Sequence, residues 1–297
     1  MNTYIQHRPK GMPRRSYAPS LFMLIACLLM SSCVNLQHVS EYATTAVTQL
    51  KTYDDLGYSF SQSCDDACAL TALRKLQLQP TDCHCQADST ADSVTTVIYK
   101  GIKSYYDGLA KLSDKDLGKY KMTGLAKSLQ AGSFGSVTIT KPQATAYTAL
   151  AGIVADAIAG AYRAKKVKGY IEAANTPIQT LLQTLSFTLR ENLEGKLNVQ
   201  QQRLQDLYFD MANDKNATQY ERTKAIEDYR AASLNLRKKQ AQLELFTKGL
   251  DKLAKAHQTL YEERNKLTLK ECQAAMSEYS DQIGGMVEAF KKIKTND

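Results

Sequence analysis

Four cysteines that lie close together in the sequence are the residues whose types and spacing most clearly allow chemistry. Two of them are one helical turn apart, and the other two follow a turn that contains Pro80: Cys64, Cys68, Cys83 and Cys85. Such a group can form two disulfides in three connectivities, or it can hold a metal ion together with His84. The compartment decides between the two, because disulfides persist where the environment is oxidising and thiolate metal sites belong mainly to reducing compartments.

Catalytic motifs are not recognisable in this sequence. The segment Gly132–Ser136 lacks the Lys-Ser/Thr pair that a P-loop needs, and the chain has no GxSxG elbow, no HExxH motif and no EF-hand loop. The paired carboxylates Asp54-Asp55 and Asp65-Asp66 have no second group beside them suited to acid–base work, so we interpret them as cap or surface charges. We therefore predict no enzyme activity, no metal site and no cofactor.

The segment Leu21–Cys33 sets the compartment. It consists of the apolar run Leu21–Met30, two serines and a cysteine, and the residues before it include four basic residues and no acidic one. A basic start, a short apolar run and small residues before a cleavage point are the parts of a secretory signal peptide. The run is too short to span a bilayer, which takes about 20 apolar residues. We therefore expect an exported protein.

The end of this segment, Met30-Ser31-Ser32-Cys33, resembles the lipobox of bacterial lipoprotein precursors. The resemblance covers residues 1–33 only, and it implies that Cys33 is acylated and becomes the N-terminus of the mature chain. The usual lipobox has Leu first and Ala or Gly before the cysteine, so Met30 and Ser32 are less typical, and a plain signal peptide with a chance cysteine is the alternative. In Gram-negative lipoproteins Asp after the cysteine favours the inner membrane. Val34 stands here, so the resemblance implies the outer membrane, on its periplasmic or its surface face.

An exported chain meets an oxidising compartment, so we prefer disulfides to a metal site for the cysteine cluster. The nested pairing of Cys64 with Cys85 and of Cys68 with Cys83 suits an antiparallel hairpin of the chain. Each bridge would stabilise the fold by roughly 3 kcal/mol in the chain-entropy model. Cys272 is left over, either as a buried small apolar residue or as one half of an intermolecular bridge.

The composition of the chain after the signal segment favours long helices. Ala, Leu, Gln, Lys and Glu dominate, and few prolines interrupt them: Pro80, Pro142 and Pro177. We expect a tether at residues 33–40. Apolar residues at helical spacing, from Gln37 onward, predict helices up to residue 76 with a break at Gly57, then over 89–112 and 115–129. Residues 41–130 are thus predicted to be N-terminal helices stapled by the disulfides.

The sequence changes character between residues 130 and 162. β-Branched residues before Pro142 indicate a loop or one small strand. Ala146–Tyr162 is the most apolar part of the mature chain, with small or polar residues at every fourth position: Thr148, Gly152, Asp156 and Gly160. We prefer a core helix packed closely through its glycines. The alternative is a membrane-inserting helix with a basic flank, although Asp156 at a bilayer centre would cost about 3 kcal/mol.

The C-terminal half predicts long helices that pair with each other. Thr176 fits an N-cap, with Pro177 as the first helical residue and Gln179 as the capping-box partner. After a break at residues 213–216, two interleaved seven-residue series run through residues 218–267. One series is Tyr229, Leu236, Leu243, Leu250 and His257, and the other is Ala232, Lys239, Phe246, Leu253, Leu260 and Leu267. This a/d seam predicts a long antiparallel coiled-coil hairpin in which His257 is a polar, register-setting residue.

The sequence as a whole predicts an all-α protein, an elongated helical bundle with a long antiparallel coiled-coil hairpin. Residues 1–32 are the predicted signal peptide, and 41–130 and 131–297 are expected to form one continuous helical body. Removal of the four basic residues in the signal segment lowers the formal net charge from +8 to about +4, too balanced to indicate a nucleic-acid partner.

For function, we expect an outer-membrane-anchored lipoprotein that binds or scaffolds a protein partner and is held to the membrane through Cys33. The main alternative is a membrane-acting helical protein that uses residues 146–162. Its architecture would be similar to that of the ClyA-type α-pore-forming toxins, although no motif supports that similarity. An enzyme with an unrecognised site is the third interpretation.

Overall fold

The computed structural model describes residues 36–81, 83–114, 129–158 and 164–295, together with Met1. Leu36–Asp297 form one compact unit, and residues 1–35 belong to a separate one. The predicted signal peptide, the predicted lipidation site Cys33 and most of the predicted helix over 115–129 therefore lie outside the described residues.

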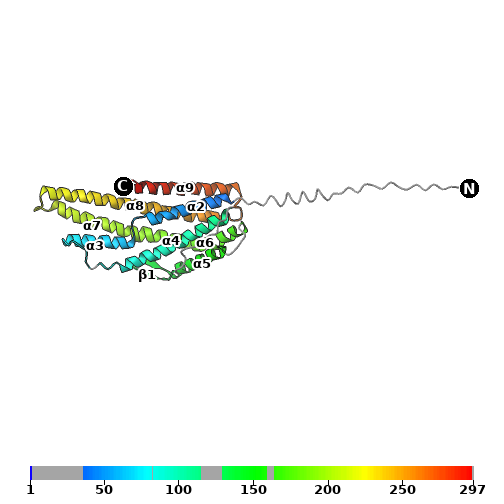
Figure 1. Cartoon of the computed structure of the whole chain (residues 1–297), viewed down its shortest axis with the longest axis horizontal. Helices are drawn as coiled ribbons and strands as arrows, with labels where there is room; N and C mark the ends of the chain where they lie inside the picture. Colours follow the sequence, from blue (N-terminus) through cyan, green and yellow to red (C-terminus); the bar gives the residue numbers. More distant parts are fainter. Residues whose placement is uncertain (2–35, 82, 115–128, 159–163, 296–297) are drawn as a thin grey trace. The chain divides into compact units, whose positions relative to one another are not determined.

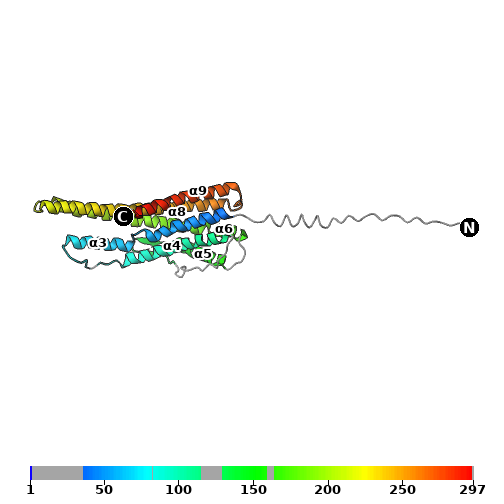
Figure 2. The same cartoon turned by 45° about the horizontal axis from the view of Figure 1, so that its top comes forward.

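The compact unit is all-α, as the sequence predicts. Its helices are α2 (Gln37–Lys51), α3 (Phe60–Arg74), α4 (Gln86–Ser113), α5 (Lys141–Ile158), α6 (Ala164–Phe187), α7 (Glu194–Asn213), α8 (Gln219–Glu262) and α9 (Lys270–Thr295). A 3₁₀ turn, η1 (Thr52–Asp55), follows α2, and a π-helical segment, η2 (Thr188–Leu193), joins α6 to α7. Figures 1 and 2 show α2 between α4 and α9, while α6 packs against α4, α5 and α8.

Helix α2 begins inside the predicted tether. Leu36 is buried at the helix N-cap position and Gln37 starts the helix, so the prediction of a tether over residues 33–40 is wrong from residue 37 onward. The physical reason is burial, because Val39 and Tyr42 complete an apolar stripe against the core. The same helix approaches α8 so closely that a Cβ at Gly249 would collide with the Gln49 side chain.

The segment after residue 130 forms a small hairpin, which corrects the prediction of a loop or one strand. Strand β1 (Gly132–Phe134) pairs antiparallel with β2 (Val137–Ile139), with Gly132 opposite Ile139. Val137 and Ile139 are buried and Thr138 is exposed, the alternation of a half-buried strand. The turn requires Gly135, whose φ is +61°.

Pro177 lies inside helix α6, so the predicted helix start at Thr176 is wrong. A proline inside a helix removes one backbone hydrogen bond and costs about 3 kcal/mol. Apolar residues on both sides of it are buried in one stripe that spans the proline: Val167, Tyr170, Ile171, Ala174, Ile178 and Leu181. Burial of this stripe offsets the proline's cost, and the cap pattern alone does not contain that information.

Helix α8 begins where the sequence predicts. Thr218 is its N-cap and forms a reciprocal capping box with Glu221. The helix ends at Glu262, five residues before the predicted end at Leu267. Along it, Leu243, Leu250 and Leu253 of the predicted seam are buried.

Helix α5 shows how the apolar segment 146–162 packs over its described part. Tyr147, Leu150 and Val154 are buried, but Gly152 and Asp156 are exposed, and a Cβ added at Gly152 would meet nothing within 4 Å. The prediction of close packing through the small-residue row is therefore wrong at Gly152, because Thr148, Gly152 and Asp156 face outward and Tyr147, Leu150 and Val154 face the core. Gly160 of that row lies outside the described residues. Among the described residues, no helix is both long enough and apolar enough to cross a bilayer.

A buried polar network fills the place where α4, α6 and α8 meet. Tyr105 Oη lies 2.6 Å from His257 Nε2, and His257 Nδ1 lies 3.1 Å from Asn175 Oδ1. Because the Asn175 amide nitrogen donates to Gln258, its oxygen accepts the Nδ1 proton, and Nε2 accepts the Tyr105 hydroxyl. Burial lowers the pKa of His257 to about 3, so this seam residue is a neutral, hydrogen-bonded part of the core.

Candidate functional site

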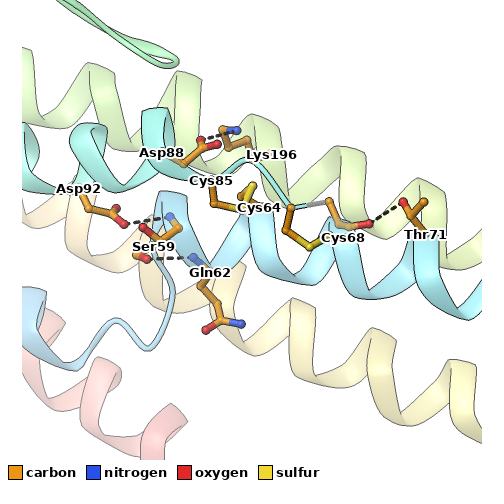
Figure 3. Close-up of a disulfide and its surroundings, with 12 residues drawn as sticks. Ser59, Gln62, Cys64, Cys68, Thr71, Cys85, Asp88, Asp92 and Lys196 are labelled. Atoms are coloured by element: carbon orange, nitrogen blue, oxygen red, sulfur yellow. Dashed lines mark hydrogen bonds and ion pairs between the residues drawn. A yellow bond between two sulfur atoms is a disulfide. The ribbon is translucent and has the colours of Figure 1, made fainter. Parts of the chain in front are cut away.

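Helix α3 is held at its start by polar contacts from two sources, shown in Figure 3. Ser59 Oγ accepts the Gln62 N–H at 3.2 Å, the ordinary N-cap contact. The Asp92 carboxylate on α4 accepts two more α3 donors, the Phe60 N–H at 2.8 Å and the Ser61 N–H at 2.9 Å. A neighbouring helix thus fixes the direction in which α3 leaves the core.

Two disulfides fasten α3 to the chain that returns to α4. Cys64 is bonded to Cys85 and Cys68 to Cys83, with Cα–Cα distances of 5.7 Å and 5.9 Å. This is the nested pairing that the sequence analysis prefers. In this pairing each of the four sulfurs is bonded to one other, so none is a free thiolate of the kind that the alternative metal site with His84 needs.

A groove runs between α3 and the pair α7 and α8, and we call it the α3 groove. Its volume is about 510 Å³. Small and leucine side chains make up most of its wall: Ala69, Leu70, Leu73, Leu204, Ala232 and Leu236. Alanines from α3 and α8 leave the space, because larger side chains at these positions would fill it.

The polar part of the α3 groove joins all three helices. The Tyr58 hydroxyl donates to Gln200 Oε1 at 2.6 Å, and Gln200 Nε2 donates to Asp66 Oδ2 at 2.9 Å. Lys239 Nζ lies 3.9 Å from Asp66 Oδ2 and 4.8 Å from the centre of the Tyr58 ring. Buried polar groups of this kind fix the position of α3 on α7 and give the groove one defined polar part.

Two arginines are the sequence neighbours of leucines in the groove wall, Arg74 next to Leu73 and Arg203 next to Leu204. Arg74 Nη2 donates to the backbone carbonyl of Arg203 at 3.4 Å, which brings the end of α3 across to α7. Neither guanidinium forms an ion pair within the part of the chain that the structure describes. The groove therefore combines an apolar wall with one charged pair of its own, Asp66 and Lys239.

A second cleft, of about 460 Å³, lies beside the start of α3 and touches the π-helical segment η2 through Leu189 and Leu193. Its carboxylates are already engaged, since Asp92 caps α3 and Asp54 accepts the Tyr99 hydroxyl at 3.0 Å. π-Helical turns often occur at functional sites, but the engaged carboxylates here serve the fold. We therefore place the candidate site in the α3 groove.

The other candidate residues lie elsewhere in the molecule. Cys272 is buried, and burial raises the pKa of its thiol to about 11, which fits the buried small residue of the two alternatives. None of the contacts described above joins His257 or Cys272 to a residue that lines the α3 groove. Sequence reasoning missed the groove, and the only local signal for it is the alanines on otherwise polar helices.

Comparison with known proteins returned no match from a protein-family model, a curated protein or a solved structure.

Proposed function

We propose that this protein is a lipid-anchored binding module of the bacterial cell envelope and that the α3 groove is its binding site. The anchor would be Cys33, supported by the lipobox-like segment Met30-Ser31-Ser32-Cys33, and Val34 favours the outer membrane as its location. The single observation that carries the binding role is the α3 groove, an apolar depression on a helix held by two disulfides.

The ligand that fits this groove best is an amphipathic helix of a partner protein. Helices bind in apolar grooves through side chains at every third or fourth position, and the leucine and alanine wall suits such a ridge. Arg74 and Arg203 follow or precede wall leucines in the sequence, and their charge would favour acidic residues on the polar face of the partner helix. The disulfides hold the groove open before binding, which lowers the ordering cost of association.

The predicted coiled-coil hairpin forms part of this proposal, because it would carry the groove. Gln240 Nε2 on α8 donates to Asn198 Oδ1 on α7 at 2.9 Å, and the rings of Tyr208 and Tyr229 lie 6.2 Å apart. Higher residue numbers on α7 thus meet lower numbers on α8, which supports an antiparallel arrangement of the two helices.

The anchor is tested by replacing Cys33 with Ser and following the protein through envelope fractionation and metabolic acyl labelling. The wild-type chain should take up the acyl label and fractionate with the outer membrane, whereas the variant should do neither. Membrane-extracted wild-type protein without acyl groups would contradict the anchor and leave the groove untouched as a proposal.

Binding in the α3 groove is tested by site-specific photo-crosslinking in cells. A crosslinker at Asn235, which lines the groove, should give a discrete adduct whose peptide maps to an amphipathic, acidic helix. The matched control is its neighbour Leu234, which is 58% exposed and does not line the groove. Leu73→Glu should abolish the Asn235 adduct by placing a carboxylate in the apolar wall. Equal adducts at both positions, or no effect of Leu73→Glu, would contradict the proposal.

A further inference from the structure

Two leucines project from the turn that follows α3. Leu76 is 91% exposed and Leu78 is fully exposed. They are two residues apart on one turn, and we call the segment Leu76–Leu78 the leucine tip. A single exposed leucine is ordinary, but two adjacent ones with almost no contact to their own protein mark a surface that another apolar phase can cover.

The backbone of the leucine tip is one that glycine normally occupies. Leu76 has φ +53°, the only described residue other than glycine with a positive φ. The N–H of Gln77 donates to the Ala72 carbonyl and the N–H of Leu76 to the Leu73 carbonyl, the two hydrogen bonds of a Schellman helix end. Glycine at this position would remove the strain, so a side chain at Leu76 works against local stability. Such an outlier is a reason to look for a role of the side chain outside the fold.

The two disulfides limit the movement of the leucine tip. Cys68–Cys83 closes the turn that contains both leucines, and Cys64–Cys85 closes the same turn one helical turn further back. The leucines are therefore presented in a constrained loop, which reduces the conformational entropy that binding would remove.

Two basic residues come directly before Leu76 in the sequence, and the acidic residue nearest to Leu78 is Asp82. Between Asp66 and Asp82 the sequence contains Arg74 and Lys75 and no acidic residue. The other residues of the tip and its flank are uncharged and polar, among them Gln77 and Gln79. An apolar point next to basic residues matches a bilayer surface that carries anionic headgroups.

We propose that the leucine tip inserts into the interfacial region of a lipid bilayer that contains anionic lipids. A bilayer is favoured over a protein partner because the tip projects outward and because leucine is under-represented among the residues that dominate protein–protein affinity. Insertion places Leu76 and Leu78 among acyl chains and Arg74 and Lys75 among headgroups. Neither Leu76 nor Leu78 lines the α3 groove, and the contact does not involve Cys33, so it goes beyond the proposed function.

The chain has no tryptophan, so Leu78→Trp introduces a single fluorescent reporter at the tip. The full chain is reconstituted in vesicles of phosphatidylcholine and phosphatidylglycerol, and protein-free vesicles of the same lipids are added. Brominated lipid is placed in one vesicle population at a time. Quenching and a blue shift of the introduced indole in either arrangement support insertion, and the arrangement tells which membrane the tip enters. The matched control is Leu269→Trp, at a leucine before α9 that is 47% exposed, and its fluorescence should be neither shifted nor quenched.

The basic residues give a second readout. Replacing Arg74 and Lys75 together by Gln should raise the phosphatidylglycerol content needed for half-maximal quenching, with apparent affinity falling roughly thirtyfold. Circular dichroism of each variant checks that the helices are intact. Absence of quenching in both arrangements, with the control behaving identically, would overturn the proposal. A blue shift that needs added envelope proteins and not lipid would also overturn it and identify the tip as a protein contact.

Discussion

The tyrosine–histidine network in the core and helix α3, which two disulfides hold, are stabilised in different ways. In the network, Tyr105, His257 and Asn175 are hydrogen-bonded to one another inside a closely packed core. Around α3, leucines stand in solvent and a groove remains open. The core is stabilised by burial, whereas α3 buries only Phe60, Ser63 and Ala72 and is held in addition by disulfides and by the Asp92 carboxylate. A surface kept open at the expense of packing is where we expect binding.

The two regions should differ most in the stability that is lost when the same side-chain atoms are removed from each. Leu250→Ala should destabilise the protein by about 2–5 kcal/mol, because Leu250 is fully buried and its removal leaves a cavity. Leu78→Ala should change stability by no more than about 0.5 kcal/mol, because Leu78 is exposed. Urea unfolding followed by circular dichroism measures both, and similar losses would show that the two regions do not differ as described.

The bracing of α3 is tested by removing one bridge. Cys64→Ser with Cys85→Ser should lower stability by roughly 3 kcal/mol in the chain-entropy model. Limited proteolysis should then cut first in the turn between α3 and α4. In the unreduced wild-type protein, thiol labelling after denaturation should reach Cys272 alone among residues 36–297. Four further reactive thiols would show that the two disulfides do not form.

The burial of His257 in the core network predicts that the stability of the folded protein depends on pH. His257 has a pKa of about 3 in the folded protein against about 6.5 when exposed, so the unfolded chain binds the proton more readily between these values. Stability should therefore fall as pH drops below about 6.5, by about 1.4 kcal/mol per pH unit. The control is Tyr105→Phe with His257→Leu, which removes both partners and should reduce this slope between pH 6 and 5. An unchanged slope would mean that His257 is not buried in its neutral form.

The smallest expected change in stability is at the leucine tip. Leu76→Gly should stabilise the protein by up to about 1 kcal/mol, because glycine adopts a positive φ without the strain of a side chain. Thermal unfolding of the two proteins under oxidising conditions measures this difference. A clear loss of stability instead would mean that the Leu76 side chain packs against its own protein.

Sequence reasoning predicted the elements that local pattern determines. The seven-residue series marks the buried seam of α8, and the break before residue 218 marks its start. The spacing of the cysteines, with an oxidising compartment assumed, led to the same nested pairing as the structure has.

The rest depends on contacts between residues far apart in the chain. The sequence around Pro177 indicates a helix start, and only the buried residues on both sides of it explain why the helix continues through the proline. The sequence around Gly152 indicates a packing residue, whereas the structure shows that it is exposed. The α3 groove needs Asp66 beside Gln200, and the core network needs Tyr105 beside His257. No local periodicity contains these pairings, so the candidate site could not be predicted from the sequence.

We infer that the disulfides hold α3 in place so that its groove can bind. It is tested most directly by the yield of the Asn235 photo-crosslink in the wild-type chain and in a variant with all four bridging cysteines replaced by serine. We predict that the adduct is largely lost in the variant, while circular dichroism shows that the helical core is retained. An undiminished adduct in a folded variant would contradict the account, because the groove would then bind without the brace that defines it.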